Sequence, residues 1–112
     1  KMKLITKEIE TKLSKNTGNA LVDKPYLKLF SPVGSATWLI TEYNKETDEL
    51  FGLCDLGHGF PEIGFVSLKE LQSMKIEPFG LSIERDKYWE PDRTLSEYNW
   101  EAKKVGSILG VI

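Results

Sequence analysis

The chain has 112 residues, of which 40% are hydrophobic and 29% are charged, and its formal net charge is −2 at pH 7. This composition is typical of a globular domain with one hydrophobic core, and the small net charge argues against indiscriminate binding to nucleic acids. It excludes a membrane-spanning helix, because such a helix needs about 20 consecutive apolar residues and the sequence has no run of that length. We expect a single domain over residues 1–112.

The cysteine content and the first residues indicate the compartment. The single cysteine, Cys54, cannot form an internal disulfide, and the N-terminal residues contain no apolar signal core. We therefore expect a cytoplasmic protein, because the cytoplasm keeps thiols reduced.

The charged residues are distributed unevenly along the chain. Residues 1–28 carry seven lysines and three acidic residues, whereas residues 77–101 carry seven acidic and three basic residues. A basic face can contact phosphates and an acidic face can dock on a basic partner, although solvated faces have the same composition.

The first predicted element is a helix that begins after Thr6, a residue type that caps helix N-termini. Ile9 and Leu13 share one face of this helix, and the turn-forming residues 16–19 end it.

Four runs rich in apolar, β-branched and aromatic residues follow the helix and predict β-strands. A polar loop separates the second run from the third, and a glycine-rich turn separates the third from the fourth. The last three runs form an antiparallel meander if they pair in sequence. The four runs occupy residues 25–30, 36–43, 50–54 and 63–66.

A capping box marks the start of the next helix. Ser67 and Glu70 fit this box, and Val66 and Leu71 are placed as a hydrophobic staple. The predicted helix is short and ends before Pro78.

The last third of the chain predicts a strand, a loop and a third helix. Residues 80–86 alternate apolar and polar side chains, and an aromatic-bearing loop follows at 87–93. Thr94 and Glu97 fit a second capping box, and Gly106 suits the end of this helix. The last six residues are open between a short strand and a frayed tail. The sequence therefore predicts an α+β fold, with an antiparallel β meander of four to five strands and two or three short helices.

The glycine-rich segment 53–64 concentrates the side chains suited to catalysis or metal binding. A turn centred near His58 and Gly59 places Asp55 opposite Glu62, and repulsion between facing carboxylates raises the pKa of one of them. Asp55, His58 and Glu62 could then form a three-ligand metal site or an acid–base pair.

Simpler interpretations of the same residues stay open. Asp55 at a glycine turn commonly bonds backbone amides, Glu62 and His58 can point into water, and Cys54 between leucines is typical of a buried thiol. Arg85 can also reach across the sheet to either carboxylate and cancel the repulsion. We therefore expect no metal and no cofactor, and Asp55 and Glu62 remain the only catalytic candidates.

The tryptophans differ in their surroundings. Trp38 lies inside an apolar strand, which predicts a core position. Trp89 lies among charged residues and a proline, which favours an exposed position from which it can contact a partner.

Several motifs of the chain resemble those of the DUF2958 family, whose name records an unknown function. The resemblance covers residues 3–105 and rests on six segments: 28–30, 36–39, 51–57, 59–64, 66–68 and 83–86. It implies a small bacterial protein carried by plasmids, phages or conjugative elements, often near DNA-modifying or antirestriction genes. His58 departs from the family pattern, which often has an aliphatic residue there. The residues that match and would fix the backbone shape are Asp55, Gly57, Gly59, Pro61, Glu62, Gly64 and Arg85.

We expect a non-enzymatic binding module of a mobile element, an anti-CRISPR or antirestriction inhibitor that acts by protein–protein occlusion. The expected partner is a protein such as a host defence nuclease, with nucleic acid not favoured, no membrane, and the oligomeric state open. The alternatives are a metal-assisted hydrolase that uses Asp55 and Glu62, and a DNA-binding accessory protein that uses the N-terminal lysines. The candidate contacts for occlusion are Glu84, Asp86, Trp89, Glu90 and Asp92.

Overall fold

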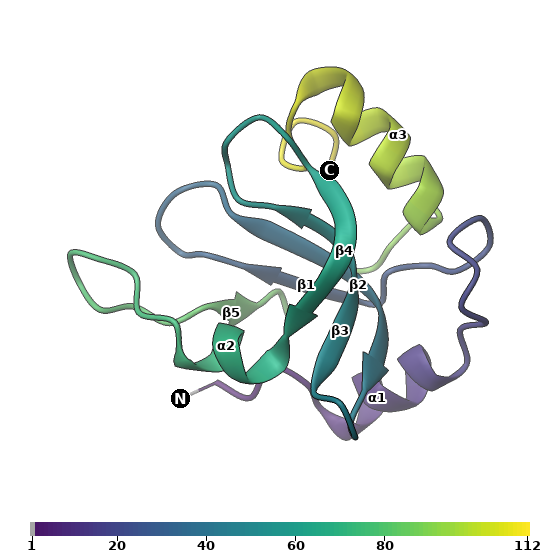
Figure 1. Cartoon of the computed structure of the whole chain (residues 1–112), viewed down its shortest axis with the longest axis horizontal. Helices are drawn as coiled ribbons and strands as arrows, with labels where there is room; N and C mark the ends of the chain where they lie inside the picture. Colours follow the sequence, from purple (N-terminus) through teal and green to yellow (C-terminus); the bar gives the residue numbers. More distant parts are fainter. Residues whose placement is uncertain (1) are drawn as a thin grey trace.

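The structure of the protein is a computed structural model that describes residues 2–112. Three helices and five strands follow one another along these described residues (Figure 1). Their order is α1 (Lys7–Ser14), β1 (Leu27–Phe30), β2 (Thr37–Asn44), β3 (Glu49–Asp55), β4 (Glu62–Ser67), α2 (Leu68–Ser73), β5 (Glu84–Arg85) and α3 (Leu95–Val105).

The five strands form one antiparallel sheet in the order β4-β3-β2-β1-β5. Strands β1 to β4 are neighbours in sequence and in space, as in a meander, and β5 returns to pair with β1 at the far edge. The predicted α+β fold, with a meander of four to five strands and two or three short helices, is confirmed.

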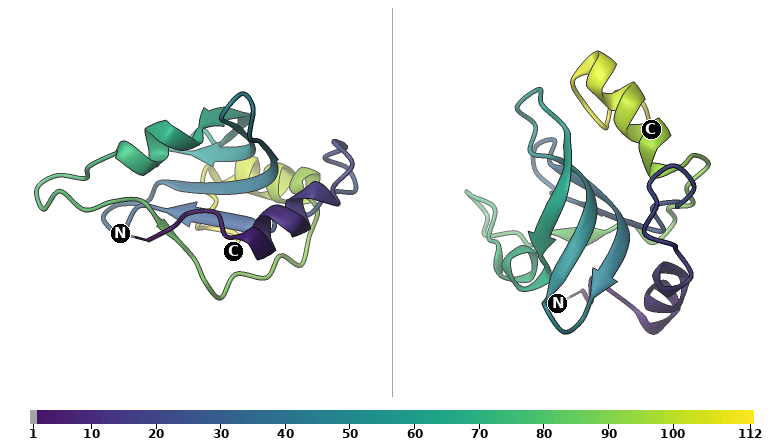
Figure 2. Two further views of the ribbon diagram at one scale, coloured as in Figure 1. Left: turned by 90° about the horizontal axis from the view of Figure 1, so that it is seen from below. Right: turned by 45° about the vertical axis from the view of Figure 1, so that its right-hand side comes forward.

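Each face of the sheet carries a hydrophobic core, because successive side chains of a strand point to opposite faces. The first core packs the N-terminal segment, α1 and α2 against Trp38, which is 2% exposed as predicted for a core residue. The second core packs α3 and the C-terminal residues on the other face, so that α2 and α3 lie on opposite sides of the sheet (Figure 2). The buried residues of the second core are Leu39, Leu53, Leu95, Tyr98, Ala102 and Ile108.

The predicted helix starts are confirmed, with one difference in the caps. Thr6 caps α1, and Thr94 with Glu97 forms the complete capping box of α3. The α2 cap forms only the half of its predicted box in which the Ser67 Oγ accepts from the Glu70 N–H. A carboxylate from the β2–β3 turn adds two other contacts at this cap, because Asp48 accepts from the Ser67 hydroxyl at 2.6 Å and from the Lys69 N–H at 3.3 Å.

Two segments differ from their predicted forms. The strand predicted at 80–86 shortens to β5, because Leu81 pairs with Ile76 in an isolated bridge before the chain reaches the sheet. The last six residues are neither a strand nor a frayed tail. They turn back over the sheet, and Ile108 is buried in the second core.

Within residues 2–112, no helix is both long and apolar enough to cross a membrane.

Candidate functional site

The β3–β4 register separates the two carboxylates that the sequence placed together. Cys54 lies opposite Glu62 and Leu53 lies opposite Ile63, so the predicted pairing of Asp55 with Glu62 is wrong by one residue. A slip of one residue moves a side chain to the other face of the sheet. Burial explains the observed register, because it lets Leu53 and Ile63 join the same core.

The Asp55 side chain serves as a structural acceptor. It is 1% exposed, and its Oδ1 and Oδ2 accept from the Gly57 and Ile108 N–H groups at 2.8 Å each. Both carboxylate oxygens are thus engaged by backbone amides, as the simpler interpretation expected. Glu62 and His58 are exposed, and residues 2–112 contain no group of three His, Cys, Asp or Glu side chains arranged to hold a metal ion.

The predicted reach of Arg85 to these carboxylates is also wrong. Arg85 belongs to β5 at one edge of the sheet, whereas Glu62 belongs to β4 at the other edge. The Arg85 guanidinium instead donates to the Lys3 carbonyl oxygen, and its backbone N–H points to the Met2 sulfur at 3.1 Å. Arg85 therefore ties the N-terminal segment to the edge of the sheet.

The glycine turn packs closely against its neighbours. Gly57 has a φ of +83°, which L side chains rarely adopt, and a Cβ there would lie 2.4 Å from the Ser35 Oγ. Together with the Asp55 bond to Ile108, this contact fixes the turn between the β1–β2 loop and the C-terminal segment. The glycine-rich segment 53–64 thus positions the C-terminal segment that carries Leu109.

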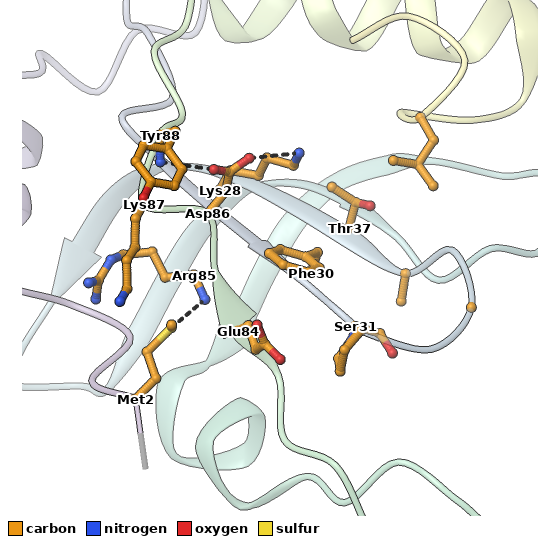
Figure 3. Close-up of a pocket in the computed structure, with 14 residues that line it drawn as sticks. Met2, Lys28, Phe30, Ser31, Thr37, Glu84, Arg85, Asp86, Lys87 and Tyr88 are labelled. Atoms are coloured by element: carbon orange, nitrogen blue, oxygen red, sulfur yellow. Dashed lines mark hydrogen bonds and ion pairs between the residues drawn. The ribbon is translucent and has the colours of Figure 1, made fainter. Parts of the chain in front are cut away.

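Leu109 forms part of the wall of a pocket of about 670 Å³ beside β5, which we call the β5 pocket (Figure 3). Strand β1 supplies Lys28 and Phe30, and β5 with the following loop supplies charged residues and the Tyr88 ring. The lining residues are Met2, Lys28, Phe30, Ser31, Pro32, Gly34, Ala36, Thr37, Glu84, Arg85, Asp86, Lys87, Tyr88 and Leu109.

One ion pair organises the polar side of the β5 pocket. The Lys28 ammonium contacts the Asp86 Oδ2 at 3.2 Å, and the Asp86 Oδ1 accepts from the Tyr88 N–H at 2.9 Å (Figure 3). Asp86 thereby holds the start of the loop that presents Tyr88. The Glu84 carboxylate makes no hydrogen bond or ion pair with the other described residues, so it stays available to a ligand.

Of the five predicted contact residues, two line the β5 pocket and three lie outside its lining. Glu84 and Asp86 line the β5 pocket. Trp89 is half-buried instead of exposed, because its Nε1 donates to the Pro25 carbonyl oxygen at 2.7 Å and its ring packs against Tyr98.

The remaining two contacts lie beyond Trp89 on the surface of the same loop. Glu90 is exposed. The Asp92 carboxylate accepts from the Arg93 guanidinium and the Tyr98 hydroxyl, and these bonds hold the pKa of Asp92 below its usual range. Asp92 therefore stays ionised in mildly acidic solution.

Cys54 behaves as a core residue. It packs against the first core, and burial raises the pKa of its thiol to about 11. At neutral pH the group is protonated, which leaves it a poor nucleophile.

Sequence reasoning missed Tyr88, the most exposed aromatic residue of the β5 pocket, with 92% of its surface accessible. The sequence predicts the aromatic-bearing loop, but it favours Trp89 as the exposed ring, whereas Trp89 packs and Tyr88 is exposed. A signal was present, because an aspartate two residues before an aromatic residue favours a tight turn that projects the ring.

The fold and the pocket define a small α+β protein with an antiparallel sheet and a charged, aromatic pocket at one sheet edge. The sequence model of a family described as "Protein of unknown function (DUF2958)" matches residues 4–109. The chain therefore belongs to the DUF2958 family, as its motifs indicated. No curated protein and no solved structure matches the chain.

Proposed function

We propose that the protein is a non-enzymatic binding module that docks on another protein through the β5 pocket and occludes its functional surface. The observation that carries this proposal is the exposed Tyr88 ring in a pocket lined by both apolar and charged side chains. Tyrosine is enriched at binding hot spots, because it offers a large rigid contact area with a polar tip.

The charges of the β5 pocket favour a polar protein surface as the partner. Glu84 and Asp86 alternate with Arg85 and Lys87 along the edge strand and its loop. Such an arrangement complements a partner that presents both signs of charge and fixes the orientation of docking. The setting implied by the family resemblance suggests a nuclease of a bacterial defence system as that partner, met by a mobile element.

The two alternative functions have weaker support. A hydrolase that uses Asp55 and Glu62 needs both carboxylates on one side of the sheet, and the register puts them on opposite faces. A DNA-binding role would use the N-terminal lysines, and of these Lys28 is paired with Asp86 while Lys3, Lys7, Lys12, Lys15 and Lys24 are exposed. The net charge of −2 opposes that role, because nucleic acid repels a negatively charged protein.

A binding and cleavage assay tests the proposal. The purified protein is mixed with a panel of restriction and CRISPR nucleases, and both co-purification and DNA cleavage are measured. We expect one nuclease to bind and lose activity, and Tyr88→Ala to weaken that binding about tenfold or more, as expected for an aromatic anchor.

Two further variants sharpen this assay. Glu84→Arg reverses a pocket charge and should also weaken binding, whereas Phe60→Ala removes an exposed ring of the glycine turn and should not. If no nuclease is bound or inhibited, or if Tyr88→Ala and Glu84→Arg act like wild type, the proposed function is wrong.

A further inference from the structure

The opposite edge of the sheet carries an exposed aromatic pair. Phe65 of β4 is 66% exposed, and it lies directly opposite Phe51 of β3 with ring centroids 4.9 Å apart. Both rings lie on the face of the sheet that α3 covers elsewhere, where Leu53 and Ile63 are packed in the second core.

The aromatic pair lies at the margin of the second core, because Phe51 packs against that core and Phe65 is not part of it. The buried side of α3 packs over Leu39 and Leu53, near the glycine-turn end of the strands. Strands β2, β3 and β4 continue past the helix to the β2–β3 turn (Figure 1). The uncovered region forms a hollow of about 370 Å³, lined by Glu42, Tyr43, Asn44, Lys45, Glu46, Glu49, Phe51 and Phe65, which we call the β4 patch.

The β4 patch is acidic around its rings. The side chains of Glu42, Glu46 and Glu49 make no hydrogen bond or ion pair among the described residues. Lys45, the one cation of the lining, is directed to Glu10 of α1 at 3.2 Å. The three carboxylates therefore surround the rings without a cation to neutralise them.

We propose that the β4 patch binds an arginine-bearing, basic segment of a partner protein. A guanidinium is planar and weakly hydrated, so it can stack on the Phe65 ring while its N–H groups bond to the surrounding glutamates. β4 is an edge strand of the sheet, so an extended segment can also pair with its free side and place alternate side chains over the patch.

The charge of the patch distinguishes this occupant from others. A second copy of the chain would set the three glutamates of one patch against those of the other, and like charges repel. Nucleic acid is repelled in the same way. The β4 patch and the β5 pocket lie at opposite edges of the sheet, so this inference does not rest on the proposed function.

Fluorescence anisotropy with three labelled decapeptides tests the proposal. The peptides alternate valine with arginine, with lysine or with glutamate. We expect the arginine peptide to bind, the lysine peptide to bind at least threefold more weakly because it lacks a planar group to stack, and the glutamate peptide not to bind. Binding of the arginine peptide should weaken as the salt concentration rises.

Matched variants localise the binding. Phe65→Leu keeps an apolar side chain but removes the aromatic face, so it should abolish the preference for arginine over lysine. Glu46→Gln and Glu49→Gln together should weaken both basic peptides several-fold, and Tyr88→Ala at the other edge should change neither.

The proposal is overturned if the arginine peptide does not bind, or if Phe65→Leu leaves the arginine preference unchanged. Size-exclusion chromatography adds a further check. A dimer that Phe65→Leu dissociates would assign the β4 patch to self-association and also overturn the proposal.

Discussion

Asp55 connects the glycine turn to a residue 53 positions further along the chain. Asp55→Ala removes both acceptors, so the buried Ile108 N–H and the part-buried Gly57 N–H lose their partners. We expect this change to lower the free energy of unfolding by about 3 kcal/mol, since each unsatisfied buried donor costs about 1–3 kcal/mol. Urea denaturation followed by circular dichroism measures the change.

Glu62→Ala provides the matched control for the Asp55 prediction. Glu62 is the other carboxylate of the motif, and it is exposed at the edge of the sheet. Its removal should change the free energy of unfolding by less than about 0.5 kcal/mol. Equal losses for the two variants would contradict the assignment of Asp55 as the structural acceptor.

At the residue scale, the sequence included the role of Asp55 as a backbone acceptor among its alternatives, but it did not indicate which residues surround Asp55. Aspartate in a glycine turn has a local preference for backbone amides, and Gly57 satisfied that expectation. Ile108 could not be anticipated, because its contact depends on the C-terminal segment folding back. The register also depended on a non-local choice, the burial of Ile63 beside Leu53.

At the scale of elements, the contact between β2 and β3 depends on one glycine. A Cβ added at Gly52 would lie 2.0 Å from the Leu39 carbonyl oxygen and 2.8 Å from the Ile40 Cα. This close approach adjoins the irregularity in the β2–β3 register between Ile40 and Glu42. We expect Gly52→Ala to force the strands apart and to lower the free energy of unfolding by about 3 kcal/mol or more.

Gly64 of β4 is the natural comparison for Gly52. It lies directly opposite Gly52, yet a Cβ there meets nothing within 4 Å. Gly64→Ala should leave stability within about 1 kcal/mol of wild type, because alanine suits a strand better than glycine. Thermal unfolding of the two variants gives the comparison, and a Gly64→Ala protein as unstable as Gly52→Ala would contradict the steric explanation.

Elements whose signals lie within a few residues were predicted well. Features that depend on contacts between distant parts of the chain were not. The caps of α1 and α3 each involve residues three positions apart, so the sequence predicts them directly, as with Thr94 and Glu97 in α3. The α2 cap depends partly on Asp48, which lies 19 residues from Ser67. Likewise, β5 is short because Leu81 pairs with Ile76 and only the end of the segment pairs with β1. The alternation of apolar and polar side chains in residues 80–86 does not indicate either pairing.

For the whole molecule, the sheet order decides where the candidate surfaces lie. The β5 pocket exists because β5 pairs with β1, which brings Lys28 to Asp86. Two of the five predicted contacts line this pocket, and the acidic segment alone indicated them. The β1 residues and Leu109 were not predicted as part of the pocket. No periodicity or motif indicates that β1, β5 and the C-terminal segment meet there.

Asp23 joins the N-terminal half of the chain to α3, and sequence reasoning did not single it out. Its carboxylate accepts from the backbone N–H groups of residues 17–19 and from the Thr17 hydroxyl. Its carbonyl oxygen accepts from the Leu95 N–H at the start of α3. Burial alone would raise the pKa of Asp23, but these hydrogen bonds outweigh it and hold the pKa below its usual value.

The depressed pKa of Asp23 makes the stability of the whole protein depend on pH. Between the folded pKa and the unfolded value of about 3.9, the unfolded chain binds more protons, so the free energy of unfolding falls as the pH falls. We expect Asp23→Asn to destabilise the protein at pH 7 and the difference from wild type to shrink below about pH 4. Urea denaturation at pH 7, 4 and 2.5 measures it, with the exposed Glu90→Gln as a control near zero throughout. A penalty for Asp23→Asn that is the same at all three pH values would show that the charge of the carboxylate does not hold residues 17–19 in place.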